Sequence, residues 1–293
     1  DGSCGGDPLA AVLTGAAIEL LQQNRKREGG PLQNYLLTMT FCGTSYHGFQ
    51  VQENALSVCT VLQDALEKAL GERPQVKGCS RTDSGVHALH YCVSFFSNTA
   101  IPPRKLPLAI NAHLPRDVRV LQVQPVADDF HARYSAMAKQ YVYRVHNSPV
   151  SSPFFDGLCW RVGPPLALQP MQQAAQAVVG THDFASFMSG GSKIVDTVRT
   201  VYRFTVTQQG EWLLFTICAD GYLYNMVRIL VGTLVEIGAG RMCAGQMPAI
   251  LAAARRSAAG PKAPAAGLYL DRVFYDDADG LCGSERPPEP LLP

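Results

Sequence analysis

The chain has 293 residues, of which 47% are hydrophobic and 17% are charged, and its formal net charge is +1. This composition supports a real core and excludes a largely disordered chain, and no apolar run has the length of a membrane span. The nine cysteines are scattered with no Cys-x-x-Cys pair, which favours free thiols in a reducing, cytoplasmic compartment over a disulfide framework.

The first predicted elements are a strand, a loop and a helix. Residues 1–34 fit no pattern and form an N-terminal extension to which we assign no role. Residues 35–40 predict a strand, and the glycines in residues 41–50 mark tight turns. Ser57 can cap a helix over residues 58–69, because apolar side chains recur there every three or four positions.

A turn centred on Asp83 joins two predicted strands, residues 75–79 and 86–96. Asp-Ser-Gly is turn chemistry, so the simplest interpretation of Asp83 is a turn former. Arg81 lies two residues earlier, and in an extended segment both side chains point to the same side. We therefore expect Arg81 to keep the carboxylate ionised, which is the form that a nucleophile needs.

The sequence Arg-Thr-Asp-Ser-Gly-Val-His-Ala, residues 81–88, resembles the signature Gly-Arg-Thr-Asp-Ala-Gly-Val-His of the bacterial tRNA pseudouridine synthase A (TruA) family. The resemblance implies that Asp83 attacks the target uridine. The chain departs from the signature at Ser80, where the family has Gly, and at Ser84, where it has Ala. Both replacements are small, so we expect no loss of activity.

The elements after this turn complete a first α+β half, residues 35–135. A helix is predicted over residues 103–113, and a strand over 118–123 that Pro125 should end. Residues 128–136, Asp-Asp-Phe-His-Ala-Arg-Tyr-Ser-Ala, resemble the family's Asp-Asp-Phe-His-Ala-Arg-Phe-Ser-Ala.

Basic and aromatic residues are mixed in and before the predicted strand 141–145, with no acid in residues 131–154. They are Arg133, Lys139 and Arg144 with Tyr134, Tyr141 and Tyr143. This mixture suits phosphates with unstacked bases, although a strand with a solvated basic face has the same composition. The resemblance implies that Tyr141 stacks on the target base, and Tyr143, which shares its face, is expected to be a packing residue.

The second half, residues 136–275, repeats the plan. Its predicted elements are a helix over 171–179, strands over 198–206 and 212–219, helices over 224–237 and 247–259, and a strand over 266–275. Arg228 is a cation in an apolar helix and needs an anionic partner. By the resemblance, the matching arginine lies near the catalytic Asp. The acidic tail, 276–293, is predicted to be disordered.

These successions predict an α+β fold. The resemblance covers both halves and implies two ferredoxin-like halves with a joined, mainly antiparallel sheet and a central RNA-binding cleft. It also implies an isomerase that makes pseudouridine at tRNA positions 38, 39 and 40 in the anticodon stem-loop, works as a homodimer and needs no cofactor or metal. The candidate catalytic residues are Asp83, Arg81 and Arg228, and the candidate substrate contacts are Tyr141, Arg133, Lys139 and Arg144.

The sequence does not support several other functions. A zinc site is one of them. His87 and His90 are three residues apart in a predicted strand, so they lie on opposite faces. His90 and Cys92 could share a face, but no second pair of ligands completes a zinc site with them. Motifs for dinucleotides, nucleoside triphosphates and serine hydrolysis are missing from the sequence. The remaining alternatives are a non-catalytic RNA-binding or tRNA-folding protein and a pseudouridine synthase for another RNA.

Overall fold

The computed structural model of the chain describes residues 31–191 and 194–276. The predicted N-terminal extension up to residue 30 and the acidic tail from residue 277 lie outside the described residues. No helix in the described part combines the length and apolar character needed to cross a membrane. The expectation of free thiols holds for Cys42, Cys59, Cys79, Cys92, Cys159 and Cys243, but not for Cys218, which is disulfide-bonded.

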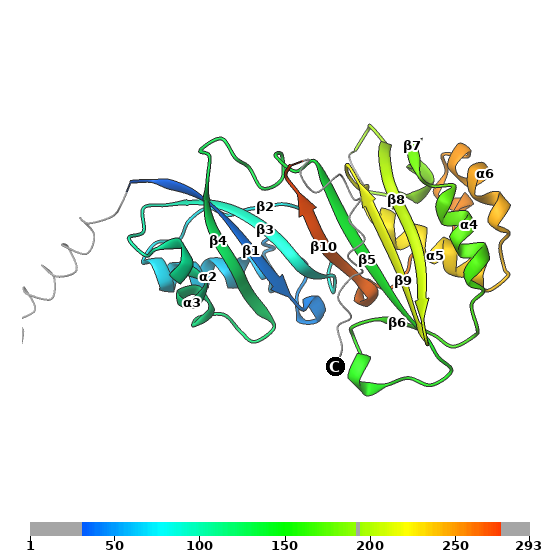
Figure 1. Ribbon diagram of the computed structural model, residues 1–293, viewed down its shortest axis with the longest axis horizontal. Coiled ribbons are helices and arrows are strands. Elements are labelled where there is room, and N and C mark those ends of the chain that lie inside the picture. Colours follow the sequence, from blue (N-terminus) through cyan, green and yellow to red (C-terminus); the bar gives the residue numbers. More distant parts are fainter. Residues whose placement is uncertain (1–30, 192–193, 277–293) are drawn as a thin grey trace, which may run out of the picture.

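One ten-stranded sheet runs through the molecule (Figure 1). Its order is β4 (Val118–Val126), β1 (Gln33–Phe41), β3 (His87–Ser97), β10 (Leu268–Phe274), β5 (Ala138–Asn147), β9 (Trp212–Ala219), β8 (Val198–Gln209) and β7 (Gly180–Asp183). Two short strands, β2 (Lys77–Gly78) and β6 (Trp160–Val162), pair with β3 and β5. Of these pairings, β10 with β3 and β6 with β5 are parallel and the others are antiparallel. The predicted joined, mainly antiparallel sheet is confirmed.

The first half has the ferredoxin-like succession of strand, helix, two strands, helix and strand, and the second half repeats it in β5, α4, β8, β9, α5 and β10, with β6, β7 and α6 as additional elements. The helices are α2 (Val58–Leu70) and α3 (Leu106–Asn111) in the first half and α4 (Leu168–Gln176), α5 (Met226–Gly238) and α6 (Met247–Ala252) in the second. The first half orders its strands β4-β1-β3-β2, and the second orders them β10-β5-β9-β8. In both halves the fourth strand along the chain lies beside the first, followed by the third and then the second. The second half therefore repeats the first, as predicted.

The last strand, β10, joins the two halves. It lies between β3 and β5, where Tyr269 pairs with His87 of β3 and with Val142 of β5. Strand β2 occupies the same edge of β3 further along, opposite Val93 and Ser94. The loop from β2 to β3 that carries Asp83 therefore lies at the junction of the halves, beside β10 and β5 in Figure 1.

Several predicted boundaries differ from the structure, and two of these differences have a clear physical cause. Strand β4 continues through Pro125 to Val126, because it is the edge strand of the sheet. A proline is tolerated on an edge strand, since its missing N–H is not needed to bond a further strand. The helix that begins at Met247 ends at Ala252 instead of Ala259. Ala254 takes a left-handed conformation, with φ of 46°, which interrupts the helix.

Candidate active site

A cleft of about 1120 Å³ lies between the two halves. The first half contributes the loop of residues 80–84, and the second contributes strand β5 and the start of helix α5. The predicted site residues that line the cleft are Arg81, Asp83, Arg133, Lys139, Tyr141 and Arg228. A smaller hollow of about 340 Å³ adjoins it, and Arg81 and Arg133 line both.

Two glycines of the loop after β1 support the Asp83 loop by close backbone contact. A Cβ atom on Gly43 would lie 2.0 Å from the carbonyl oxygen of Val86. Gly48 has a φ of 80°, and a Cβ there would lie 2.2 Å from the carbonyl oxygen of Thr82. The glycine-rich loop therefore needs glycine at these positions so that its backbone can hold the Asp83 loop in place.

His87, the histidine of the signature, has a structural role. Its Nδ1 accepts a hydrogen bond of 3.0 Å from the Gly43 amide, so in the neutral ring Nε2 carries the proton and donates to the Ala266 carbonyl at 3.1 Å. Burial lowers the pKa of His87 to about 4, so the ring is neutral near pH 7. The histidine thereby ties the loop after β1 to the segment before β10.

Asp83 and Arg228 form a salt bridge across the cleft. Arg228 Nη1 lies 2.9 Å from Asp83 Oδ2, and the side chains of Asp83 and Arg228 are 28% and 11% exposed, respectively. Arg228 also donates to the Asn225 side chain at 3.0 Å and to the Ala263 carbonyl at 2.8 Å. The predicted anionic partner of Arg228 is confirmed, and these bonds offset the cost of burying its charge.

The salt bridge occupies one carboxylate oxygen of Asp83. Among the residues that the structure describes, no hydrogen bond reaches the other oxygen, Oδ1. Arg228 thus fixes the orientation of the Asp83 carboxylate through Oδ2, while Oδ1 keeps its lone pairs for a nucleophilic attack. Asp83 lines the cleft.

The expected pairing of Arg81 with Asp83 is wrong. Arg81 is exposed, and within residues 31–191 and 194–276 the ion pair of Asp83 is with Arg228. The prediction assumed the regular geometry of a strand, whereas residues 81–83 lie in the loop between β2 and β3, after bends at residues 79–80 and before a turn at residues 84–85. The alternation of side chains that holds in a strand does not apply there.

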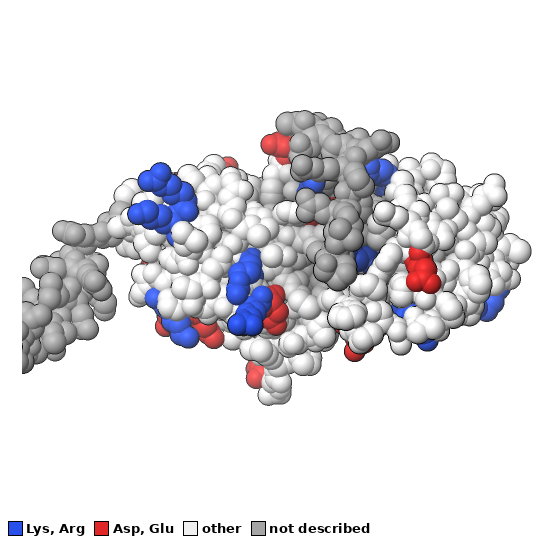
Figure 2. All heavy atoms as spheres, turned by 60° about the horizontal axis from the view of Figure 1, so that its bottom comes forward, with Lys and Arg blue, Asp and Glu red and all other residues white. Residues whose placement is uncertain are grey.

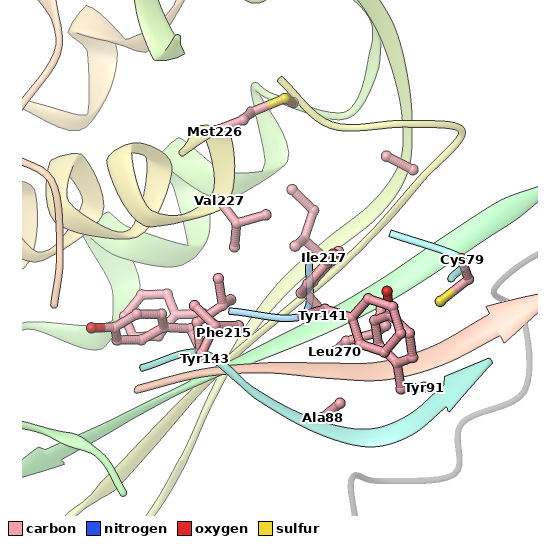
Figure 3. Packing of buried hydrophobic residues seen from close by; sticks show 14 of the residues in the cluster. Cys79, Ala88, Tyr91, Tyr141, Tyr143, Phe215, Ile217, Met226, Val227 and Leu270 are labelled. Carbon is pink, nitrogen blue, oxygen red and sulfur yellow. The ribbon is translucent and has the colours of Figure 1, made fainter. Parts of the chain in front are cut away.

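Tyr141 and Tyr143 project from the same face of β5 into different surroundings. Tyr141 lines the cleft, and its ring packs edge-on against Tyr222 at 4.9 Å. Tyr143 is fully buried, and its hydroxyl donates to the Pro264 carbonyl at 2.7 Å. In Figure 3, Tyr143 lies by Phe215, its partner on β9, and Tyr141 lies toward Cys79 and Tyr91. Tyr143 is a packing residue, as predicted.

The expected contact of Arg144 with tRNA is wrong. Arg144 is only 7% exposed, and its guanidinium lies 4.5 Å from the ring centre of Tyr269. It follows Tyr143 on β5, so it points to the face opposite the cleft. Lys139 shares the face of Tyr141 and lines the cleft, where burial lowers its pKa.

Sequence reasoning missed two residues that shape the site. Asn225 has a left-handed φ of 63° and contacts both Arg228, at 3.0 Å, and Ser189, at 2.9 Å. Tyr222 packs against Tyr141, and its hydroxyl donates to the Lys139 carbonyl at 2.8 Å. Their position directly before the Arg228 helix was the available signal, because loops that end strands and begin helices often carry functional groups.

The charges on one face of the molecule are spread thinly. On the face shown in Figure 2, Lys and Arg side chains form separate patches among uncharged residues and no continuous band. The cleft is lined by Arg81, Arg133, Lys139 and Lys262, in addition to Arg228, which is paired with Asp83.

Comparison with known proteins gives consistent matches. A family model described as "tRNA pseudouridine synthase" matches residues 38–135 and 174–276. A tRNA pseudouridine synthase A from Thermoanaerobacter sp. (strain X514) is 43% identical over 244 residues, which are 83% of this chain and 100% of that protein. Proteins with the same name from Acetivibrio thermocellus and Moorella thermoacetica are 41% and 43% identical, over 83% and 82% of this chain and 100% and 98% of theirs.

Proposed function

The chain belongs to the tRNA pseudouridine synthase family, and from this premise we propose that Asp83 is the nucleophile with which it isomerises uridine in the anticodon stem-loop of tRNA. The observation that supports this assignment is the Asp83–Arg228 salt bridge on the wall of a cleft that also presents Tyr141. A structural turn aspartate would not need a buried arginine from the other half of the molecule.

The reaction explains why the site has few polar side chains. Pseudouridine formation breaks the bond from N1 to C1′ and makes a bond from C5 to C1′, while the proton on C5 leaves and N1 gains a proton. Oxidation state does not change, so no electron acceptor is required. The target base must leave the stack at a cost of about a few kcal/mol, and stacking on Tyr141 would recover about 1–3 kcal/mol.

Two routes are open to the Asp83 carboxylate. It can attack C1′ of the sugar and displace uracil, or it can add to C6 of the ring before the glycosidic bond breaks. Either route needs an ionised carboxylate with one accessible oxygen, and the salt bridge leaves Oδ1 available. Arg228 orients the nucleophile, and the exposed Arg81 would fill the space that the flipped base leaves in the stem-loop.

Tyr141 or a water molecule removes the C5 proton. Burial raises the pKa of Tyr141 above its usual value, so near pH 7 its side chain is a neutral phenol. Tyr141 can therefore take up the C5 proton only as it releases its own hydroxyl proton, and N1, which gains a proton in the reaction, is the acceptor that balances this step. Arg133 and Lys139, which line the same cleft, would hold phosphates beside the flipped nucleotide.

The family resemblance supports finer assignments. We propose that tRNA positions 38, 39 and 40 are the targets, that two copies of the chain form the working homodimer, and that the protein acts in the cytoplasm. Sedimentation of the purified protein at micromolar concentration tests the dimer.

Tritium release is the test of the proposed function. Full-length tRNA with tritium on C5 of its uridines should lose label to water when it is mixed with the protein, because C5 gives up its proton when it bonds to C1′. Mapping of the product should place pseudouridine at positions 38 to 40. A protein that binds this tRNA and releases no tritium would be a non-catalytic RNA-binding protein.

Arg133→Gln should weaken tRNA binding through loss of a phosphate contact. Arg133 is exposed and lines the cleft. We therefore expect a less steep salt dependence: in a plot of the logarithm of the tRNA association constant against the logarithm of the salt concentration, the magnitude of the slope should decrease by about one. Arg73→Gln is the matched control, because Arg73 is paired with Asp64 and Glu67 at 2.6 and 2.8 Å on helix α2. An equal change of slope in both variants would contradict a specific role of Arg133.

A further inference from the structure

Ser80 and Tyr141 bring two hydroxyl groups together at the cleft. Ser80 Oγ and Tyr141 Oη are 3.0 Å apart, within hydrogen-bonding distance. Ser80 stands where the family signature has a glycine, which has no side chain to make this contact. We propose that Ser80 is a positioning residue that orients the Tyr141 hydroxyl toward the target uridine, an inference that rests on the proposed function.

The backbone of Ser80 is held by a buried tyrosine. The Tyr91 hydroxyl donates to the Ser80 carbonyl and lies 3.4 Å from its amide nitrogen. Tyr91 is fully buried, and its ring stacks on Phe49 with the centroids 4.3 Å apart. Ser80 is therefore anchored to the core of the first half, while Tyr141 belongs to the second half.

The hydroxyl of Tyr141 is otherwise free to rotate. Its ring is positioned by the edge-on contact with Tyr222, but a ring contact does not fix the direction of the O–H bond. In the described part of the chain, no group other than Ser80 hydrogen-bonds to this hydroxyl. Ser80 is thus the side chain that decides where the Tyr141 proton points before the substrate arrives.

Ser80 can either accept a hydrogen bond from the Tyr141 hydroxyl or donate one to it. Its oxygen also lies 3.3 Å from the Arg81 carbonyl, to which it can donate while it accepts from Tyr141. When Ser80 donates to Tyr141 instead, the tyrosine proton is released toward the cleft. The change needs only rotation of two hydroxyl groups, so Ser80 can keep its bond to Tyr141 while the tyrosine turns to the substrate.

A double-mutant cycle tests this role. Ser80→Ala removes the hydroxyl, and we expect the single-turnover rate on tRNA to fall about 3- to 10-fold, as for the loss of one hydrogen bond between neutral groups. The dissociation constant for tRNA should stay within about twofold of the original. In the Tyr141→Phe protein, which has no hydroxyl for Ser80 to orient, adding Ser80→Ala should cause no further loss.

Ser84→Ala is the matched control. Ser84 is exposed in the same loop, and its hydroxyl donates to the Tyr46 carbonyl at 3.4 Å. We expect it to leave the rate unchanged. Ser80→Gly, which restores the family residue, is a second variant that should fold and show the same loss as Ser80→Ala.

Each outcome decides the inference. Full rates in both Ser80→Ala and Ser80→Gly would overturn it, and so would an equal loss from Ser80→Ala with and without the Tyr141 hydroxyl, because a merely structural role predicts that. If Tyr141→Phe is impaired but the Ser80 variants are not, the proposed function survives and this inference fails. If the unmodified protein releases no tritium from tRNA, both are overturned.

Discussion

Asp83→Asn should abolish pseudouridine formation. The change keeps the size of the side chain and removes the negative charge with which Asp83 would attack, so we expect the single-turnover rate to fall by about 10⁴-fold or more. The side-chain carbonyl of the new asparagine could still accept a hydrogen bond from Arg228, which lies 2.9 Å from Oδ2 of Asp83, so the fold should survive. Tritium release, tRNA affinity and melting temperature together measure the effect.

Asp156→Asn is the control for this variant. Asp156 is also a loop aspartate, but it is exposed and does not line the cleft. Its substitution should leave turnover and tRNA affinity unchanged. Turnover that persists in Asp83→Asn would remove Asp83 from the mechanism, whereas a large drop in melting temperature would show that the salt bridge with Arg228 serves mainly to join the two halves.

Tyr141→Phe should lower turnover by about 10²–10⁴-fold, the range of a group that takes part in proton transfer. The ring remains and can still stack on the base, so tRNA affinity should be nearly unchanged. Tyr141→Leu should lose stacking as well, which is worth about 1–3 kcal/mol. With deuterium on C5 of the target uridine, the isotope effect on the single-turnover rate should rise in Tyr141→Phe, because removal of the C5 proton becomes slower than the other steps.

Tyr143→Phe is the matched comparison for Tyr141→Phe. It removes the hydroxyl that donates to the Pro264 carbonyl at 2.7 Å, so it should cost stability, by about 0.5–1.5 kcal/mol for one hydrogen bond. It should leave the rate of turnover nearly unchanged. A loss of turnover in Tyr143→Phe with normal turnover in Tyr141→Phe would mean that the two tyrosines have been assigned to the wrong roles.

Local sequence determined most of the elements. Helix α2 has its predicted limits within one residue, because Ser57 accepts a bond from the Thr60 amide and Gly71 takes a left-handed φ of 77°. Both are local features that any sequence with those residues can form. The errors at Pro125 and Ala254 have a different origin. The position of β4 at the sheet edge depends on strand order, and directly after Ala254 the Arg255 amide donates to the Ser186 hydroxyl at 2.9 Å, a contact with a residue distant in the chain.

The candidate site also has a part that sequence predicted and a part that only the tertiary structure shows. The resemblance of residues 81–88 to a family signature singled out Asp83 and implied that the arginine matching Arg228 lies near it, and the apolar surroundings of Arg228 required an anion. The choice of Arg228 over Arg81 as the partner of Asp83 needed the tertiary structure, because Asp83 and Arg228 are 145 positions apart and Arg81 lies in a loop instead of a strand.

Sequence by itself determined the family, the succession of strands and helices and the identity of the central aspartate, because these depend on short-range patterns and a local motif. Only the tertiary structure decided that β10 lies between β3 and β5, that the cleft borders the face of β5 opposite Arg144 and that Ser80 meets Tyr141. These depend on the order of the strands and on which face of the sheet borders the cleft. Both are set by packing between the halves.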